Sequence, residues 1–424
     1  MKNNFTLSNK NYIWHPFTQM KTADVPIHIV KGEGALLWDN NNNTYIDAIS
    51  SWWTNIHGHA NPYIAEKMHA QLLQLEHVIF AGFTHTPAET LAERLIENHL
   101  PKNQSKVFFS DNGSTAVEVA IKMALQYWFN KGIKKTKIIA LENSYHGDTF
   151  GSMSVSARSA FTHPFDTMLF DVIHITAPYA GQEQQCFNTL RELLNSDDTI
   201  AAIIYEPLVQ GSGGMHMYAP DALDMLISIC KSKNILCIAD EVMTGFYRTG
   251  KMFASDYCIN KPDIMCISKG ITGGTMALGL TTCAEEIFNA FYDDDAKKAL
   301  YHGHSYTGNP LACAAANASL DLCELPAFKK QIETILQMHG DFITTLQHHT
   351  KVKNARRAGT ILAFEIESSN SDYFSTIKKT LYPAFLKAGV LLRPLGNTIY
   401  IMPPYCITEQ QLQKVYDVIE EVIG

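Results

Sequence analysis

Two short apolar runs, each ending in one ionisable residue, constrain the fold of this chain more than any other feature. Residues 234–241 end in Asp240 and Glu241, and residues 263–270 carry Lys269 at their end. Runs this short and this rich in Ile, Leu, Met and Cys are typical of strands buried in a parallel sheet. Parallel strands deliver their last residues to the edge where α/β sheets bind ligands. We therefore expect a carboxylate and an amine to meet at one edge of such a sheet.

The chemistry of this pair indicates a cofactor. A Lys buried at a strand end has a lowered pKa and is a good nucleophile toward carbonyl groups. An Asp beside it suits the protonated nitrogen of a pyridine ring. Together, Lys269 and Asp240 indicate pyridoxal phosphate (PLP), held by a Schiff base to the Lys with an acidic partner at the ring nitrogen. The alternative is that both are ordinary solvated strand-end residues, and the two residues alone do not decide.

Composition narrows the class of protein. The 424 residues are 46% hydrophobic and 18% charged, which is ordinary for a globular chain long enough for two domains. The net charge of −8 and the lack of any basic cluster longer than a pair argue against nucleic-acid and membrane partners. Residues 1–10 are polar and no apolar run reaches transmembrane length, so we expect a cytoplasmic protein.

The cysteines and histidines do not form a metal motif. The nine cysteines are irregularly spaced without a C-x-x-C, which is typical of reduced, packed thiols. Two His-x-His pairs, His57/His59 and His302/His304, have no Cys or carboxylate cluster beside them. We therefore predict no metal site.

Strand and helix patterns alternate through the middle of the chain. Strands are predicted over 106–110, 137–141 and 200–205, and helices over 116–130 and 222–232. This order predicts an α/β fold with a mostly parallel sheet covered on both faces. An Ala-rich helix follows Asn309-Pro310, and beyond Pro326 the pattern changes to a smaller α+β region with a helix over 328–346. We expect a large domain over 48–325 and a small domain formed by 1–47 together with 326–424.

Two loops after predicted strands could hold a ligand. In residues 111–115, Gly113 permits close approach, Ser114 offers a hydroxyl and the following helix offers free N–H groups, a combination suited to phosphate. The alternative is an ordinary helix cap, because Thr115-x-x-Glu118 spells a capping box. In residues 143–149, Tyr145 could stack on a flat ring or pack on the sheet, and the polar residues around it favour a site.

Two further motifs argue against competing chemistries. The Gly-rich residues 210–214, after Tyr205-Glu206-Pro207, lack the third Gly of a dinucleotide motif because His216 stands there. Residues 301–309 resemble a nucleophile elbow, but Thr307 stands where Gly is required, which argues against a serine hydrolase.

Arginine and tryptophan residues suggest a substrate with a carboxylate and an apolar chain. Arg248 and Arg393 are flanked by Gly or Pro and apolar residues, and Arg is the preferred residue for gripping a carboxylate. Arg393 is the better placed, because apolar runs on both sides indicate a buried strand edge; a surface ion pair is the alternative. Trp52-Trp53 have small and polar neighbours, which favours an exposed apolar wall over core packing.

In this order, these motifs resemble the class III, fold type I, PLP-dependent aminotransferases nearly end to end. The resemblance is carried by residues 240–250, 267–270, 206–207 and 302–310. Residues 14–19, 51–53, 145–149, 393–394 and 402–404 are similar to those of the biotin-pathway members, which aminate 8-amino-7-oxononanoate with S-adenosylmethionine.

The resemblance implies a role for each matching residue. Lys269 would form the Schiff base and move protons, Asp240 would keep the pyridine nitrogen protonated, and Tyr145 would stack on the ring. The cofactor would also be held by Gly113, Ser114, His304 and, from the partner subunit, Ser305. Substrate would contact Trp52, Tyr145, Lys269, Gly303, Phe17 and Arg393, the last through its carboxylate. These roles imply a homodimer with active sites at the subunit interface.

Phe17 departs from the pattern. Many members that use S-adenosylmethionine have Tyr here, and the missing hydroxyl removes a hydrogen bond of about 0.5–1.5 kcal/mol. Some relatives that use lysine as amino donor also have Phe, so lysine stays open. The same residues could also belong to an ω-aminotransferase for diamines or β- or γ-amino acids, to a PLP isomerase or to a non-catalytic binder. The intact Asp240/Lys269 pair argues against a non-catalytic binder.

Overall fold

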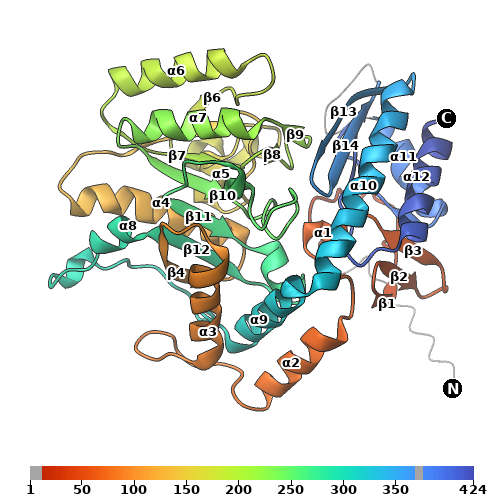
Figure 1. The fold of residues 1–424 in the computed structure, drawn as a ribbon, viewed down its shortest axis with the longest axis horizontal. Helices are drawn as coiled ribbons and strands as arrows, with labels where there is room; N and C mark the ends of the chain where they lie inside the picture. The colour runs from red at the N-terminus through yellow and green to blue at the C-terminus, as the bar shows by residue number, and fades with distance from the viewer. Residues whose placement is uncertain (1–11, 368–375) are drawn as a thin grey trace.

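A computed structural model describes residues 12–367 and 376–424, which are organised around a seven-stranded sheet (Figure 1). The strand order is β4-β12-β11-β10-β7-β5-β6. The strands span Gln104–Ser110 (β4), Lys137–Leu141 (β5), Ile173–Ile175 (β6), Ile200–Tyr205 (β7), Leu236–Asp240 (β10), Ile264–Ile267 (β11) and Gly279–Ala284 (β12). Strands β6, β5, β7, β10 and β11 pair in parallel, and β12 is antiparallel to both β11 and β4. The predicted α/β fold with a mostly parallel sheet is confirmed.

Helices cover this sheet on both faces. The side chains of Ile138, Ile204 and Ile238 pack with α4 (Gly113–Asn130) in one apolar cluster. Their sequence neighbours point to the opposite face and pack with α6 (Glu183–Ser196) and α7 (Pro220–Lys231). Every residue of β7, β10 and β11 is buried, which explains why these strands are continuously apolar in the sequence.

The two ends of the chain meet in smaller sheets beside the large one (Figure 1). Strand β15 (Val390–Leu391) pairs in parallel with β3 (Thr44–Asp47), which continues through β2 (Leu36–Asp39) to β1 (Ile29–Glu33). A three-stranded antiparallel sheet contains β13 (Val352–Ala358), β14 (Ile361–Ile366) and β16 (Thr398–Ile401). The helices of this region are α10 (Pro326–His348), α11 (Thr376–Lys387) and α12 (Glu409–Ile423).

The remaining long helices lie in the first quarter of the chain and after the large sheet. They are α2 (Pro62–Leu72), α3 (Thr86–Arg94) and α9 (Pro310–Glu324), which is the predicted Ala-rich helix. The amphipathic face of α2 is narrow, because Ile64 is its buried residue while Leu72 is 52% exposed. Within the described ranges, no helix is both long and apolar enough to cross a bilayer.

The large sheet brings Asp240 and Lys269 to one edge. Asp240 is the last residue of β10 and lies in register with Cys266 of the neighbouring strand β11. Lys269 follows the end of β11 by two positions. Both side chains therefore leave the sheet at the carboxyl edge of adjacent parallel strands.

Candidate active site

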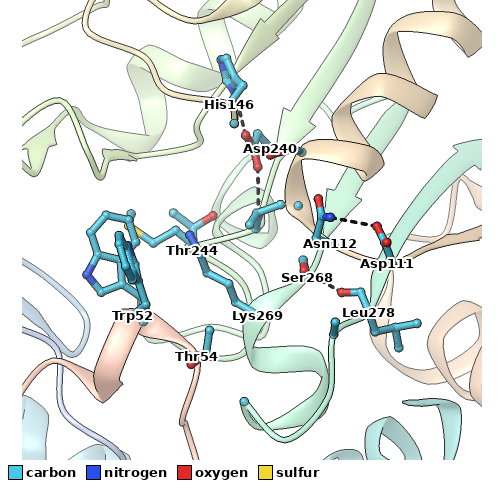
Figure 2. A pocket seen from close by; sticks show the side chains of 18 of the residues that line it. Trp52, Thr54, Asp111, Asn112, His146, Asp240, Thr244, Ser268, Lys269 and Leu278 are labelled. Carbon is cyan, nitrogen blue, oxygen red and sulfur yellow. Dashed lines mark hydrogen bonds and ion pairs between the residues drawn. The ribbon is translucent and has the colours of Figure 1, made fainter. Parts of the chain in front are cut away.

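A cavity of about 440 Å³ opens at this edge, and Asp240 and Lys269 both line it (Figure 2). Its walls come from distant parts of the chain. They include Trp52, Gly113, Ser114, Tyr145, His146, Gly147, Glu206, Thr244, Ser268 and Met276. A cavity with apolar walls and a few converging polar groups is the usual form of a small-molecule site.

The carboxylate of Asp240 is held by two hydrogen bonds. Its Oδ2 accepts from His146 Nδ1 at 2.7 Å, and its Oδ1 accepts from the backbone N–H of Val242 at 3.1 Å (Figure 2). Asp240 is 4% exposed, so the bonds fix its direction in a site with little water. His146 had no role assigned from the sequence, although its place beside Tyr145 after a strand was a usable signal.

Lys269 stands on a tight turn, η4 (Lys269–Thr272), with its backbone in the left-handed region at φ +46°. Burial lowers the pKa of its amine from 10.5 to about 8, against the carboxylates of Asp240 and Glu206, which raise it. Its Nζ lies 4.6 Å from the centre of the Trp53 ring. A buried amine with this pKa is partly unprotonated near neutral pH and can attack a carbonyl group.

The start of α4 differs from the prediction. Asn112 is the N-cap: its Oδ1 accepts from Thr115 N at 3.0 Å, and Thr115 Oγ1 accepts from Asn112 N at 3.1 Å. The capping box predicted from Thr115 and Glu118 is therefore wrong, because the helix begins three residues earlier. Glu118 instead accepts from Gly151 N at 2.7 Å.

The first turn of α4 fits a phosphate group. An added Cβ at Gly113 would lie 2.7 Å from a methyl carbon of Val242, and one at Gly147 would lie 2.1 Å from Ser114 Oγ. These glycines let the backbone close around the cavity beside the free N–H groups of a helix N-terminus. With Asp240 for a pyridine nitrogen and Lys269 for an aldehyde, the residues present fit PLP.

Tyr145 forms part of the cavity wall, and its position depends on Glu206. Glu206 Oε2 accepts from the backbone N–H of Tyr145 at 3.0 Å, and Oε1 accepts from Gly211 N at 2.9 Å. Burial raises the pKa of Glu206 to about 7. The sequence marked Glu206 as a strand-end residue but did not predict this contact.

Three predicted substrate residues, Phe17, Trp52 and Arg393, lie together beside the cavity, and we call this group the mouth. Trp52 lines the cavity and is 45% exposed, its ring lies 5.7 Å from that of Phe17, and the guanidinium carbon of Arg393 lies 5.1 Å from its centre. Trp53 is instead 5% exposed and donates from Nε1 to Tyr400 Oη at 3.0 Å. Both tryptophans line the cavity, but the predicted exposure holds for Trp52 and not for Trp53.

The remaining predicted residues lie outside the cavity wall. Arg248 is 1% exposed and donates to the carbonyl oxygen of Pro403 at 2.8 Å, so it belongs to the interior. Gly303, His304 and Ser305 lie on the segment between η5 (Ala296–Lys298) and α9, away from the cavity of this single chain. Their roles at the cofactor and the substrate mouth stay predictions.

Comparisons with known proteins agree on one family. The family model described as aminotransferase class-III matches residues 18–423. The adenosylmethionine-8-amino-7-oxononanoate aminotransferase of Synechococcus elongatus is 44% identical over 420 residues, which cover 97% of this chain and 98% of that protein. The Helicobacter pylori protein of the same name is 40% identical over 437 residues, covering 99% and 98%.

Solved structures support the same family. The Methanocaldococcus jannaschii enzyme of that name matches with a TM-score of 0.93 and 36% identity, covering 98% of this chain and 97% of that one. An amine transaminase from an uncultivated Pseudomonas species, solved in its PLP-bound form, matches with a TM-score of 0.91 and 30% identity, covering 97% and 98%.

Proposed function

Because this chain belongs to the class-III aminotransferase family, a PLP-dependent group of enzymes, we propose that it aminates 8-amino-7-oxononanoate with S-adenosylmethionine. The product would be 7,8-diaminononanoate, in biotin synthesis. The observation that carries the proposal is the mouth of the cavity, where the cation of Arg393 lies over the apolar ring of Trp52. The names of relatives such as those from Synechococcus and Helicobacter point to the same substrates.

PLP, when bound, supplies a protonated ring that withdraws electrons from the carbon bearing the amino group. Asp240 Oδ2, held by His146, would keep the ring nitrogen protonated. The N–H groups of Gly113 and Ser114 would hold the phosphate. Lys269 Nζ would take a proton from the carbon of the amino donor in the first half-reaction, and in the second it would give a proton to the carbon that receives the amino group.

The substrate wall suits a long keto acid. A nine-carbon chain with its carboxylate at the end remote from the 7-oxo group would lie along Trp52 and Phe17. The guanidinium of Arg393 would pair with that carboxylate in a bidentate fork. Phe17 is 46% exposed and offers an aromatic face without a hydroxyl, which is the observation that keeps lysine as a second candidate donor.

We also propose the architecture around this site. A large domain over 48–325 and a small domain from 1–47 with 326–424 agree with the pairing of β3 and β15, although residues 1–11 and 368–375 lie outside the described ranges. A homodimer would bring Ser305 of the partner subunit to the phosphate of the cofactor. We further propose that the protein acts in the cytoplasm.

A half-reaction tests the substrates one at a time. Purified holoenzyme is mixed with S-adenosylmethionine, or with lysine, and the visible cofactor band is followed without acceptor. Bleaching with S-adenosylmethionine and recovery on adding 8-amino-7-oxononanoate are expected. Bleaching with lysine but not with S-adenosylmethionine would identify lysine as the amino donor. Phe17→Tyr should then increase the bleaching by S-adenosylmethionine. No bleaching with either donor would refute the proposed substrates.

The role of Lys269 is tested separately. The Lys269→Ala variant should bind PLP reversibly and give no turnover, because no other amine among the cavity-lining residues can take over the proton transfer. Turnover surviving in this variant would contradict the mechanism.

A further inference from the structure

The Gly-rich loop and the turn that carries Tyr145 are joined at three points. Strands β8 (Val209–Gln210) and β9 (His216–Met217) form a hairpin whose loop is residues 211–215. Gln210 Nε2 donates to the carbonyl oxygen of Glu142 at 2.8 Å, and Glu206 bridges Gly211 N and Tyr145 N. A Cβ at Gly213 would lie 2.1 Å from the carbonyl oxygen of Asn143, so the two backbones touch. Loop and turn are therefore held together as one unit.

Arg356 of β13 ties this unit to the three-stranded sheet. Its Nε donates to the carbonyl oxygen of Met215 at 2.8 Å, and one Nη donates to that of Gly214 at 2.5 Å. The other Nη donates to Glu365 Oε1 at 2.9 Å, on the paired strand β14. One guanidinium thus joins the Gly-rich loop to the three-stranded sheet.

The two carbonyl groups held by Arg356 belong to residues with unusual backbones. Gly214 has φ +110° and Met215 has φ +56°, both in the left-handed region. A non-glycine residue there is retained only where its surroundings fix it, and the two charge-assisted hydrogen bonds supply such a restraint. The bent loop accordingly depends on Arg356 for its shape.

The same sheet leads to the carboxylate-binding side of the mouth. Arg356 pairs in register with Ala363, which pairs with Tyr400 of β16, the residue that accepts the Trp53 hydrogen bond. Arg393 lies five positions before β16. Arg356 therefore links the Tyr145 side of the cavity to the Arg393 side.

We propose that Arg356 is a positioning residue that sets the spacing between Tyr145 and Arg393, and hence the grip on the keto acid. It is not among the residues that line the cavity, and it acts through residues 211–215 and Glu206. This inference rests on the proposed function for its substrate, and on the loop geometry for its structural part.

The variant R356K provides the sharpest test. Lys keeps the positive charge beside Glu365 but cannot reach both carbonyl groups with a planar fork. The neighbouring R357K is the matched control, since Arg357 donates to the Leu336 carbonyl oxygen on α10 and faces away from the loop. Holoenzymes of the wild type and both variants are compared for steady-state kinetics and for hydrogen exchange of the amides of Gly211 and Tyr145.

We expect KM for 8-amino-7-oxononanoate to rise about tenfold in R356K, with kcat changed less than about threefold, because two hydrogen bonds that shape the mouth are lost. The Gly211 and Tyr145 amides should exchange about tenfold faster. R357K should match the wild type in both measurements. Glu365→Gln, which loosens Arg356 without removing its fork, should give the same changes at about threefold.

Two outcomes overturn the proposal. Unchanged exchange of the two amides in R356K would show that the loop does not depend on Arg356. Equal changes in R356K and R357K would indicate general loosening of β13. The exchange measurement needs no substrate, so a wild-type protein that rejects 8-amino-7-oxononanoate would refute the proposed function while the loop is still tested. If R356K does not fold, Glu365→Gln decides by the same two measurements.

Discussion

Glu241 offers a test of how burial in this interior changes the pKa of a carboxyl group. It follows Asp240 in the sequence and is fully buried. Its carboxyl group accepts from Thr244 Oγ1 at 2.6 Å, Ala254 N at 3.1 Å and Ser255 N at 2.7 Å. These bonds favour the ionised form, but burial outweighs them and raises the pKa of Glu241 to about 7. The group lies outside the cavity wall, so its effect on stability can be separated from cofactor binding.

The expected magnitude follows from the two pKa values. An ordinary Glu has a pKa of 4.5, and a folded value of about 7 means that the folded state keeps its proton to higher pH than the unfolded state. The free energy of unfolding therefore falls as pH rises from about 4.5 through 7. At about 1.4 kcal/mol for each pH unit, the ionised group costs roughly 3 kcal/mol once the pH exceeds about 8.

Glu241→Gln should remove this dependence. Gln stays neutral and offers one acceptor oxygen, so at least one of the three donors loses its partner, at a cost of about 1–3 kcal/mol at every pH. The difference in the free energy of unfolding between variant and wild type should thus start negative at pH 5. It should rise by roughly 3 kcal/mol by pH 8.5, where the variant equals or exceeds the wild type.

Urea unfolding of the PLP-saturated proteins at four pH values measures that difference, because pH effects of cofactor binding cancel between the two. The exposed Glu66 supplies the control, because Glu66→Gln removes a carboxyl group without changing the interior. A flat difference for Glu241→Gln would refute the reasoning, since it would mean that burial does not control this carboxyl group.

Two further predictions concern the cofactor site. Gly147→Ala should weaken PLP binding at least about tenfold, measured by titration of the apoenzyme, because the new Cβ would lie 2.1 Å from Ser114 Oγ at a φ of +131°; unchanged affinity would mean that the loop adjusts freely. The rate at which apoenzyme captures PLP should rise with pH and level off above about 9, since the Lys269 pKa of about 8 leaves roughly a quarter of the amine unprotonated at pH 7.5; a rise centred near 10.5 would contradict the effect of burial.

The fold was most predictable where strands are apolar throughout. The predicted bounds of 137–141 and 200–205 match β5 and β7, because every residue of these strands is buried except Lys137 at the start of β5. Strand β12 was not predicted. Its Thr281 and Thr282 are polar but buried. The hydroxyl of Thr281 donates a hydrogen bond to the carbonyl oxygen of Ala116, and that of Thr282 donates to Gln104 Oε1, both at 2.7 Å. A strand with these polar residues can be buried only because the folded chain supplies hydrogen-bond partners, which the local sequence does not reveal.

The site was predictable at its strand ends and not in its supporting contacts. Asp240 and Lys269 follow from the rule that parallel strands end at ligands. The partners of the site come from 61 to 94 positions away, in the contacts Tyr145–Glu206 and His146–Asp240. No local pattern encodes contacts over that separation, so His146 and Glu206 could be noticed in the sequence but not assigned.

The sequence identified Lys269 as a site residue but could not predict the direction of its side chain. Its φ of +46° costs roughly 1–3 kcal/mol for a side chain other than Gly, so the surroundings must fix the turn. Ser268 Oγ donates to the carbonyl oxygen of Leu278 at 2.6 Å on one side, and Ser319 Oγ donates to that of Gly270 at 3.3 Å on the other. Between these anchors the chain reverses, and Nζ reaches the ring of Trp53 inside the cavity. Hydrogen bonds from two serines on different parts of the chain thus hold the strained turn, and this turn directs the Lys269 amine into the cavity.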